Sequence, residues 1–241
     1  MAQTNTERTK ALISKADCYV RLRDLDEARK TMMRVNHFGL SDSLSERVRY
    51  QTALYSYLCQ EFEQCNSQLL QLEQHSSERT NNEYLLLYAL SLNETREWTM
   101  AREKLNTWLK NAPLDSIRHD SIWDAADRFY KLSKQPRYVD PERAKFFSSI
   151  VPGTGQLYAG YLFESAFSAT MVLVGVGAAA YGVLILKYYV TGLMTGFVIS
   201  QQFYTSGIRR ADFLAQKRNF KAARKYNDKL KNFILDLGSP L

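Results

Sequence analysis

Histidines, cysteines and one glycine-rich loop are the residues whose types could support chemistry. The three histidines, His37, His75 and His119, are far apart and belong to no HExxH, Cys/His metal-binding or nucleophile-elbow pattern. The Gly-Thr-Gly-Gln sequence at 153–156 has no Lys-Ser/Thr pair after it and no predicted strand before it, so it does not match a phosphate-binding loop. We therefore expect no enzymatic activity, no catalytic or metal-binding residues, no cofactor and no small-molecule substrate.

The three cysteines, Cys18, Cys59 and Cys65, cannot all pair within one chain and show no CxxC spacing. We interpret them as apolar thiols in helix packing, which favours a reducing compartment. Residues 1–10 are polar and lack the apolar core of a signal peptide. One alternative stays open, because the first residues after Met1 could remain from a removed leader.

Charge is unevenly distributed along the 241 residues, whose net charge is +7. Residues 1–150 carry 22 Lys/Arg and 21 Asp/Glu, whereas residues 151–241 carry 10 and 4, and nine of those ten cations follow Gly207. The basic character therefore belongs to the C-terminal tail. It predicts an anionic partner for the tail and argues against a nucleic-acid-binding protein.

Three segments repeat a small residue followed by large apolar residues four and seven positions later. The small residues lie 37 and 36 positions apart, and another alanine lies twelve positions before each. Small residues let two antiparallel helices approach closely, so the pattern predicts three helix pairs. The predicted contact residues are Ala16, Ala28, Ala53, Cys65, Ala89 and Ala101.

This pattern resembles the tetratricopeptide repeat, whose period is about 34 residues. The resemblance covers residues 9–113, with Pro113 placed where the last helix should end. The Gly that usually follows the first-helix Leu is replaced by alanine in all three units. A seventh helix at 116–134 is predicted to cap the array. We interpret Trp98, Trp108 and Trp123 as core residues, with an aromatic peptide-binding groove as the alternative.

Two uncharged stretches in the second half predict a membrane hairpin. Residues 165–186 would form a helix about 33 Å long, enough to cross a hydrocarbon core of about 30 Å. Residues 191–207 are also uncharged but more polar, and a buried helix of a soluble domain is the alternative for them. Gly192 and Gly196 have the small-xxx-small spacing of close helix contacts, and Gln201 and Gln202 should face protein or water rather than lipid.

A compact motif precedes the first stretch. Its sequence, Pro-Gly-x-Gly-Gln-x-Tyr-x-Gly, resembles the signature of small bacterial membrane modules with helical hairpins, some of which follow tetratricopeptide-like repeats. The resemblance implies a membrane module and a bacterial origin, and it implies no activity. The matching residues are Pro152, Gly153, Gly155, Gln156, Tyr158 and Gly160.

The tail at 208–241 alternates apolar and basic residues and is predicted to be an amphipathic helix. It could lie on an anionic leaflet, or it could pack on the repeats as a solvated helix. The cations expected to contact lipid are Arg209, Arg210, Lys217, Arg218, Lys221, Arg224 and Lys225. Two spans would place the repeats and this tail on one side, and the positive charges favour the cytoplasmic side of a bacterial inner membrane. A removed leader would instead favour the periplasm.

Together these patterns predict an all-α protein. It consists of a tetratricopeptide-like array with a capping helix at 1–134, a linker at 135–145, a membrane module with two transmembrane helices at 146–207, and a basic amphipathic helix at 208–241. The predicted function is a membrane-anchored protein–protein interaction scaffold. Two alternatives are a structural subunit of a larger membrane complex, held by its hairpin, and a soluble protein with a hydrophobic hairpin.

Overall fold

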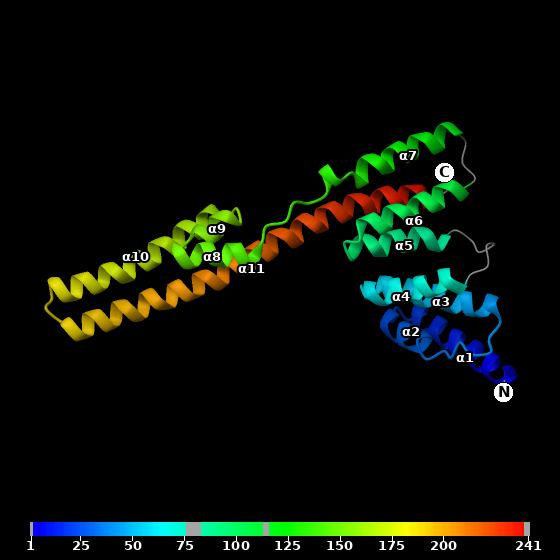
Figure 1. Cartoon of the computed structure of the whole chain (residues 1–241). Helices are drawn as coiled ribbons and strands as arrows, with labels where there is room; N and C mark the ends of the chain where they lie inside the picture. The colour runs from blue at the N-terminus through cyan, green and yellow to red at the C-terminus, as the bar shows by residue number, and fades with distance from the viewer. Residues whose placement is uncertain (1, 76–82, 113–115, 239–241) are drawn as a thin grey trace. The chain divides into compact units, whose positions relative to one another are not determined.

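The computed structural model describes residues 2–75, 83–112 and 116–238. Over these ranges the chain forms eleven α-helices and one short 3-10 helix, with no strand (Figure 1). The predicted all-α class is confirmed. The chain divides into two compact units, which are described separately. The first unit contains Met1–Gln135 and Asn227–Leu241, and the second contains Pro136–Tyr226.

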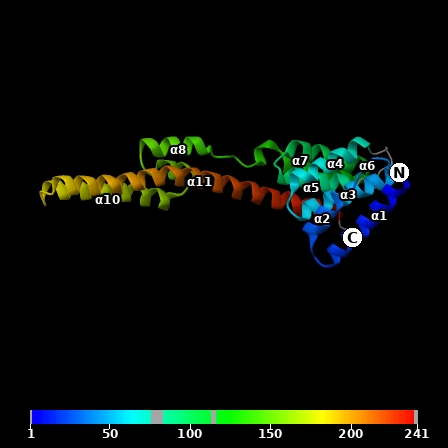
Figure 2. The ribbon, with the colours of Figure 1, turned by 90° about the horizontal axis from the view of Figure 1, so that it is seen from below.

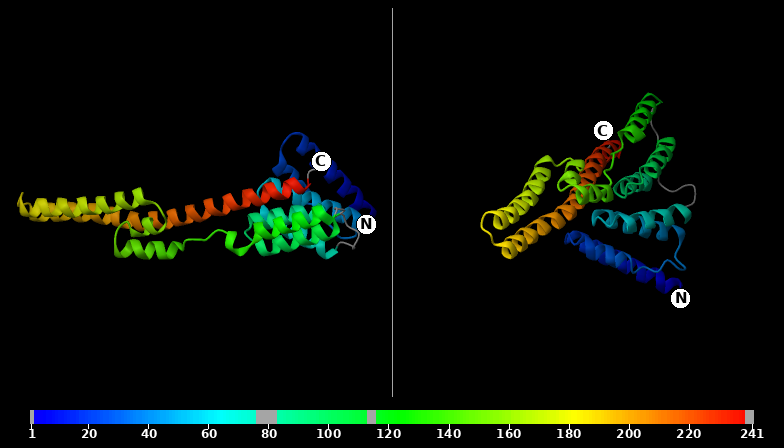
Figure 3. Two further views of the ribbon diagram at one scale, coloured as in Figure 1. Left: turned by 90° about the horizontal axis from the view of Figure 1, so that it is seen from above. Right: turned by 60° about the vertical axis from the view of Figure 1, so that its left-hand side comes forward.

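Helices of the first unit pack in consecutive pairs, α1 with α2, α3 with α4 and α5 with α6. Figure 3 shows the pairs as successive layers, coloured from blue to green. The bounds are α1 Ala2–Arg21, α2 Leu25–Met32, α3 Asp42–Leu58, α4 Phe62–His75, α5 Glu83–Glu94, α6 Trp98–Asn111, α7 Ser116–Tyr130 and the 3-10 helix Leu132–Lys134. Pro113, expected to end the last paired helix, lies outside the described residues.

The same turn joins the two helices of every pair. Arg23, Gln60 and Arg96 each adopt a left-handed backbone, with φ of 61°, 65° and 68°. In each turn this residue's N–H bonds to the carbonyl three residues back, and the next N–H bonds to the carbonyl five residues back, at 2.8–3.1 Å. This is the pattern of a Schellman helix end. The next helix therefore starts at the same point in all three pairs.

Large apolar side chains fill the space between these helices. Met32, Leu69 and Leu105, the residues four positions after the three small ones, are at most 1% exposed. Seven positions after the third small residue, Trp108 is only partly buried, and its neighbour Leu109 is fully buried instead. The predicted period therefore holds, with a shift of one residue at the end of α6.

The last part of α11, the helix Tyr189–Gly238, belongs to the first unit. Leu230 and Ile234 are fully buried there, and the Phe233 ring lies 4.8 Å from the Phe129 ring of α7. The separate tail expected at 208–241 is therefore wrong, because α11 continues through that boundary without a break. The start of α11 is part of the second unit.

The second unit contains α8 Pro141–Ile150, α9 Thr154–Tyr158, α10 Leu162–Leu184 and the first part of α11. Asp140 caps α8, since its carboxylate accepts the N–H of Glu142 at 2.9 Å, and Pro141 occupies the first turn. The linker expected at 135–145 therefore ends at 140. Figure 2 shows α10 lying beside the start of α11.

Among the described residues, one helix is long and apolar enough to cross a membrane, namely α10 with its 23 residues. Most of this helix is uncovered by protein. In its most apolar stretch of 18 residues, 17% is buried. Helix α11, with 50 residues, is long enough, but it is not apolar enough by the same measure.

Candidate functional site

All six residues predicted to hold the helix pairs together are fully buried. Each of the first six helices contributes one of them: Ala16, Ala28, Ala53, Cys65, Ala89 and Ala101 are 0% exposed. A larger side chain at any of these positions would have to push the paired helices apart. Burial also raises the pKa of the Cys65 thiol to about 11.

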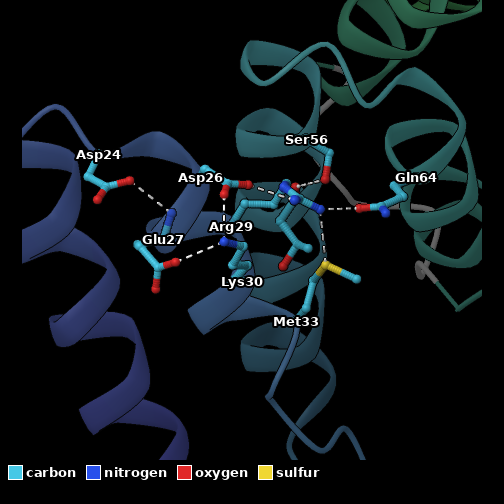
Figure 4. Close-up of polar contacts among 9 residues, drawn as sticks. Asp24, Asp26, Glu27, Arg29, Lys30, Met33, Ser56 and Gln64 are labelled. Carbon is cyan, nitrogen blue, oxygen red and sulfur yellow. Dashed lines mark hydrogen bonds and ion pairs between the residues drawn. The ribbon is translucent and has the colours of Figure 1, made fainter.

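Polar side chains connect one helix pair to the next. Arg29 of α2 donates to Gln64 of α4 at 2.6 Å and also pairs with Asp26 at 2.7 Å (Figure 4). Lys104 of α6 reaches Glu73 of α4 at 2.6 Å. These contacts lie at the surface of the pairs and set their stacking, and sequence periodicity gave no sign of them.

The described residues contain no group of three or more His, Cys, Asp or Glu side chains that could hold a metal ion. His37 Nδ1 lies 2.9 Å from Ser45 Oγ, and its burial lowers its pKa. His75 Nδ1 lies 2.8 Å from the Gln71 carbonyl. Both histidines line one open hollow of about 340 Å³.

The motif at 152–160 forms the turn between α8 and α9, the short helix α9, and the turn between α9 and α10. Gly153 and Gly160 have φ of 96° and 83°, a conformation that favours glycine. Glycine is needed at position 155 for a different reason, because a Cβ there would collide with the Ala144 carbonyl of α8. The glycines therefore allow α9 to lie directly against α8.

Gln156 is the buried polar centre of the motif. Its side chain is 0% exposed; its Oε1 accepts from Ser148 Oγ at 3.0 Å, and its Nε2 donates to the Gly207 carbonyl at 2.9 Å. Ser148 Oγ also accepts the Gly155 N–H at 3.1 Å. Gln156 thus joins α8, α9 and α11 through paired polar groups.

Two other motif residues lie near the surface. The Tyr158 ring packs edge-on against Phe147 at 5.2 Å, and its carbonyl accepts from Arg218 at 3.4 Å. Pro152 precedes the left-handed Gly153 and is partly buried. All six motif residues therefore belong to one compact segment of the second unit, formed by α9 and the turns on either side of it.

Small residues line the contact between α10 and the start of α11. A Cβ on Gly182 would lie 2.8 Å from the Gly192 Cα, and one on Gly196 would collide with Ala179. The contacts run in opposite directions along the two helices. In order, they are Gly182 with Gly192, Ala179 with Gly196, Gly175 with Ser200, Ser168 with Gly207, and Glu164 with Arg210.

Gly192 and Gly196 thus lie in this contact, as expected, but Gln201 and Gln202 do not. Both glutamines are exposed. The contact residues of α11 recur every three to four positions, and 201 and 202 fall on the other faces of the helix. That they face protein or water rather than lipid stays a prediction.

The seven cations expected to contact lipid are all exposed: Arg209, Arg210, Lys217, Arg218, Lys221, Arg224 and Lys225. The apolar stripe behind them is buried against protein, with Ala211, Leu214 and Ala215 at 0% exposure. This stretch of α11 therefore cannot insert its apolar stripe into a leaflet. Only its cations and the exposed rings of Phe213 and Phe220 face outward.

A hollow of about 220 Å³ lies beside Gln156, where α9, α10 and α11 meet. At its rim Arg210 binds Glu164 through two hydrogen bonds, Nη2 to Oε1 at 2.6 Å and Nε to Oε2 at 3.1 Å. Inside it, Ser168 is 8% exposed and its Oγ has no hydrogen-bond partner. Sequence reasoning missed this hollow, because its residues are separated by up to 54 positions and share no motif.

Comparison with known proteins gives no relative from which a function could be transferred: no family model, no curated protein and no solved structure matches the chain.

Proposed function

We propose that this protein is a non-catalytic, membrane-anchored scaffold of bacterial origin, whose tetratricopeptide-like helix pairs bind a protein partner. In this proposal α10 and residues 189–207 of α11 span the bilayer as a two-helix hairpin. The observation that carries it is the uncharged, closely packed pair formed by these two segments.

The charges of this pair lie only at its two ends. Lys187 lies in the turn between the helices, and Glu164 and Arg210 pair at the opposite end. Between them α10 and α11 carry no Asp, Glu, Lys or Arg except Arg209. An α-helix of about 20 residues matches the hydrocarbon thickness, so both segments have the length of a span.

The outward face of the pair is apolar and uncovered by protein. Contiguous exposed apolar surfaces of this kind are rare in soluble monomers and indicate contact with a membrane or with protein. The residues that form it, each at least 54% exposed, include Leu173, Val174, Val176, Leu193, Phe197 and Val198.

Support for the scaffold comes from the first unit. Its three helix pairs share one turn geometry and one pattern of buried small residues. Stacked helix pairs provide extended surfaces that other proteins use for binding.

Two measurements test the membrane position. We expect the protein to stay in the membrane pellet after alkaline carbonate washing, and recovery in the supernatant would exclude the spanning proposal. The second measurement uses a variant with its native cysteines replaced by alanine and one new cysteine at exposed Lys187 or Lys221. An impermeant maleimide on spheroplasts should label only one of the two positions, because two spans place them on opposite sides.

The same labelling experiment determines the orientation. Seven cations lie between Arg209 and Lys225, against one in the turn at Lys187, so the positive-inside rule places the repeats and the anionic-lipid contacts in the cytoplasm. Labelling at Lys187 alone agrees with this. Labelling at Lys221 alone would place the helix pairs and the cations in the periplasm.

A second candidate function is a structural subunit of a larger membrane complex. The exposed Gln201 and Gln202 favour it, because amides facing lipid are costly and amides facing another helix are not. Replacing both with leucine should then abolish co-purification of membrane partners, and a substitution on the surface of α3 should not. Loss of co-purification with the α3 substitution, but not with the two leucine replacements, supports the scaffold.

A further inference from the structure

The hollow beside Gln156 has the features of a ligand site. Its wall is mostly apolar, and its polar groups lie at defined positions along it. The lining residues are Gln156, Glu164, Phe167, Ser168, Phe203, Ser206, Gly207 and Arg210.

Ser168 supplies the first sign of a missing partner. It is 92% buried, and its hydroxyl makes no hydrogen bond, although a buried hydroxyl normally has one. Gln156 does not supply one, since its amide bonds to Ser148 and the Gly207 carbonyl. The Ser168 Oγ is sealed from solvent, so a ligand that brings a hydrogen-bond acceptor satisfies it only when the wall of the hollow opens.

The order of groups along the helices gives the second sign. The Glu164 and Arg210 pair lies at the end of the uncharged segments, and Ser168 lies one turn, about 6 Å, further along α10. Phe203 lies about one turn beyond Gly207, the residue opposite Ser168. The wall therefore changes from charged groups to the Ser168 hydroxyl to the Phe203 ring along the direction of the proposed span, and Phe167 lies at the level of Ser168.

A diacyl phospholipid has the same order of groups, with a charged head group, ester carbonyls directly below it, and acyl chains. The rim of the hollow carries one cation and one anion. An ethanolamine head group matches it, because its phosphate is negative and its primary ammonium is positive.

On the basis of the proposed membrane position, we propose that this hollow binds one phosphatidylethanolamine molecule of the bilayer. Arg210 binds the phosphate, Glu164 binds the ammonium, the Ser168 hydroxyl donates to an ester carbonyl, and the acyl chain lies against Phe167 and Phe203. The existing pair between Glu164 and Arg210 must open. Their side chains are 36% and 47% exposed, and ion pairs this exposed contribute little to stability.

The test uses the full-length protein in nanodiscs containing equal amounts of phosphatidylethanolamine and phosphatidylglycerol. Native mass spectrometry then counts the lipids that stay bound after release. We expect one tightly held phosphatidylethanolamine. Ser168→Ala should reduce its retention about threefold or more, and Glu164→Gln should abolish the preference over phosphatidylglycerol. Ser165→Ala, on the same helix but outside the hollow, is the control and should change neither value.

A photoreactive phenylalanine analogue in place of Phe203 gives a second measurement in intact cells. Crosslinking to a lipid, reduced by Ser168→Ala, supports the proposal. Crosslinking to a protein segment overturns it, as does equal retention of both lipids by the unaltered protein. If the protein does not enter nanodiscs at all, the membrane function fails together with this proposal; entry without a bound lipid excludes this proposal alone.

Discussion

One buried hydrogen bond among the contacts that attach the end of α11 to the first unit can be removed by a single substitution. Trp98 Nε1 donates to Asn227 Oδ1 at 3.0 Å, and the two residues are 8% and 4% exposed. The other end of the Asn227 amide bonds to Glu94 at 3.3 Å, a carboxylate that is only partly buried and can bind water instead. Asn227→Ala therefore removes the acceptor of this buried hydrogen bond from the Trp98 indole N–H.

Removing one partner of a buried hydrogen bond costs about 1–3 kcal/mol. Alanine also has a higher helix propensity than asparagine, which partly offsets this cost. Asn232→Ala is the matched control, because Asn232 is exposed on the same helix and gains the same propensity. The difference between the two variants thus isolates the hydrogen bond. It corresponds to an increase of about 5- to 140-fold in the opening equilibrium of the helix end.

Limited trypsin digestion measures this opening, since Lys229 and Lys231 become cleavable only when the helix end unfolds. When opening and closing are fast relative to cleavage, the cleavage rate follows the opening equilibrium. We expect Asn227→Ala to be cut after these lysines at least fivefold faster than Asn232→Ala. Equal rates in the two variants would refute the reasoning that this hydrogen bond stabilises residues 227–238 in the first unit.

Three further predictions concern the helix pairs. Ala101→Leu should lower the free energy of unfolding by about 1–3 kcal/mol, because the position is fully buried. Met100→Leu, at a 40% exposed position, should change it by under about 0.5 kcal/mol. Equal losses of the two variants in chemical denaturation would contradict the packing. With its pKa raised to about 11 by burial, Cys65 should resist a thiol reagent at pH 8 that modifies exposed Cys18, and simultaneous modification of both would disprove its burial. Burial lowers the pKa of His37, so the unfolded state binds more protons and stability should fall as pH drops below about 6.5; His37→Gln should flatten this slope, and an unchanged slope would assign it to another group.

The helix pairs could be predicted because their packing leaves a periodic trace in the sequence. Ala28, Cys65 and Ala101 recur at nearly equal spacing, and all three are fully buried. The turns between the helices leave no such trace. Their left-handed positions hold Arg23, Gln60 and Arg96 rather than glycine, so the usual sign of a helix end is missing. The hydrogen bonds that close each turn stabilise it in place of glycine.

The boundary predicted at 207/208 coincides with no helix end, because a change in composition was interpreted as a change in structure. The uncharged segment ends near Gly207 and basic residues follow. A helix ends where its backbone loses hydrogen bonds, and no proline interrupts the sequence between 189 and 238. Helix α11 therefore continues from the uncharged segment into the basic one. Burial of Leu214 and Leu230 stabilises it on the far side of that boundary.

Gly207, at the boundary between the uncharged and the basic parts of α11, contacts the motif at 152–160. A Cβ at this position would lie 2.7 Å from Ser168 Oγ, closer than real Cβ contacts allow, so α11 approaches α10 there only as glycine. The same residue presents its carbonyl to Gln156, which is separated from it by 51 positions. The motif glycines place α9 against α8, and Gln156 then connects α9 to α11 at the position where Ser168 of α10 lies against Gly207. The motif residues are thus explained by a contact with a residue outside the motif, which local spacing alone could not reveal.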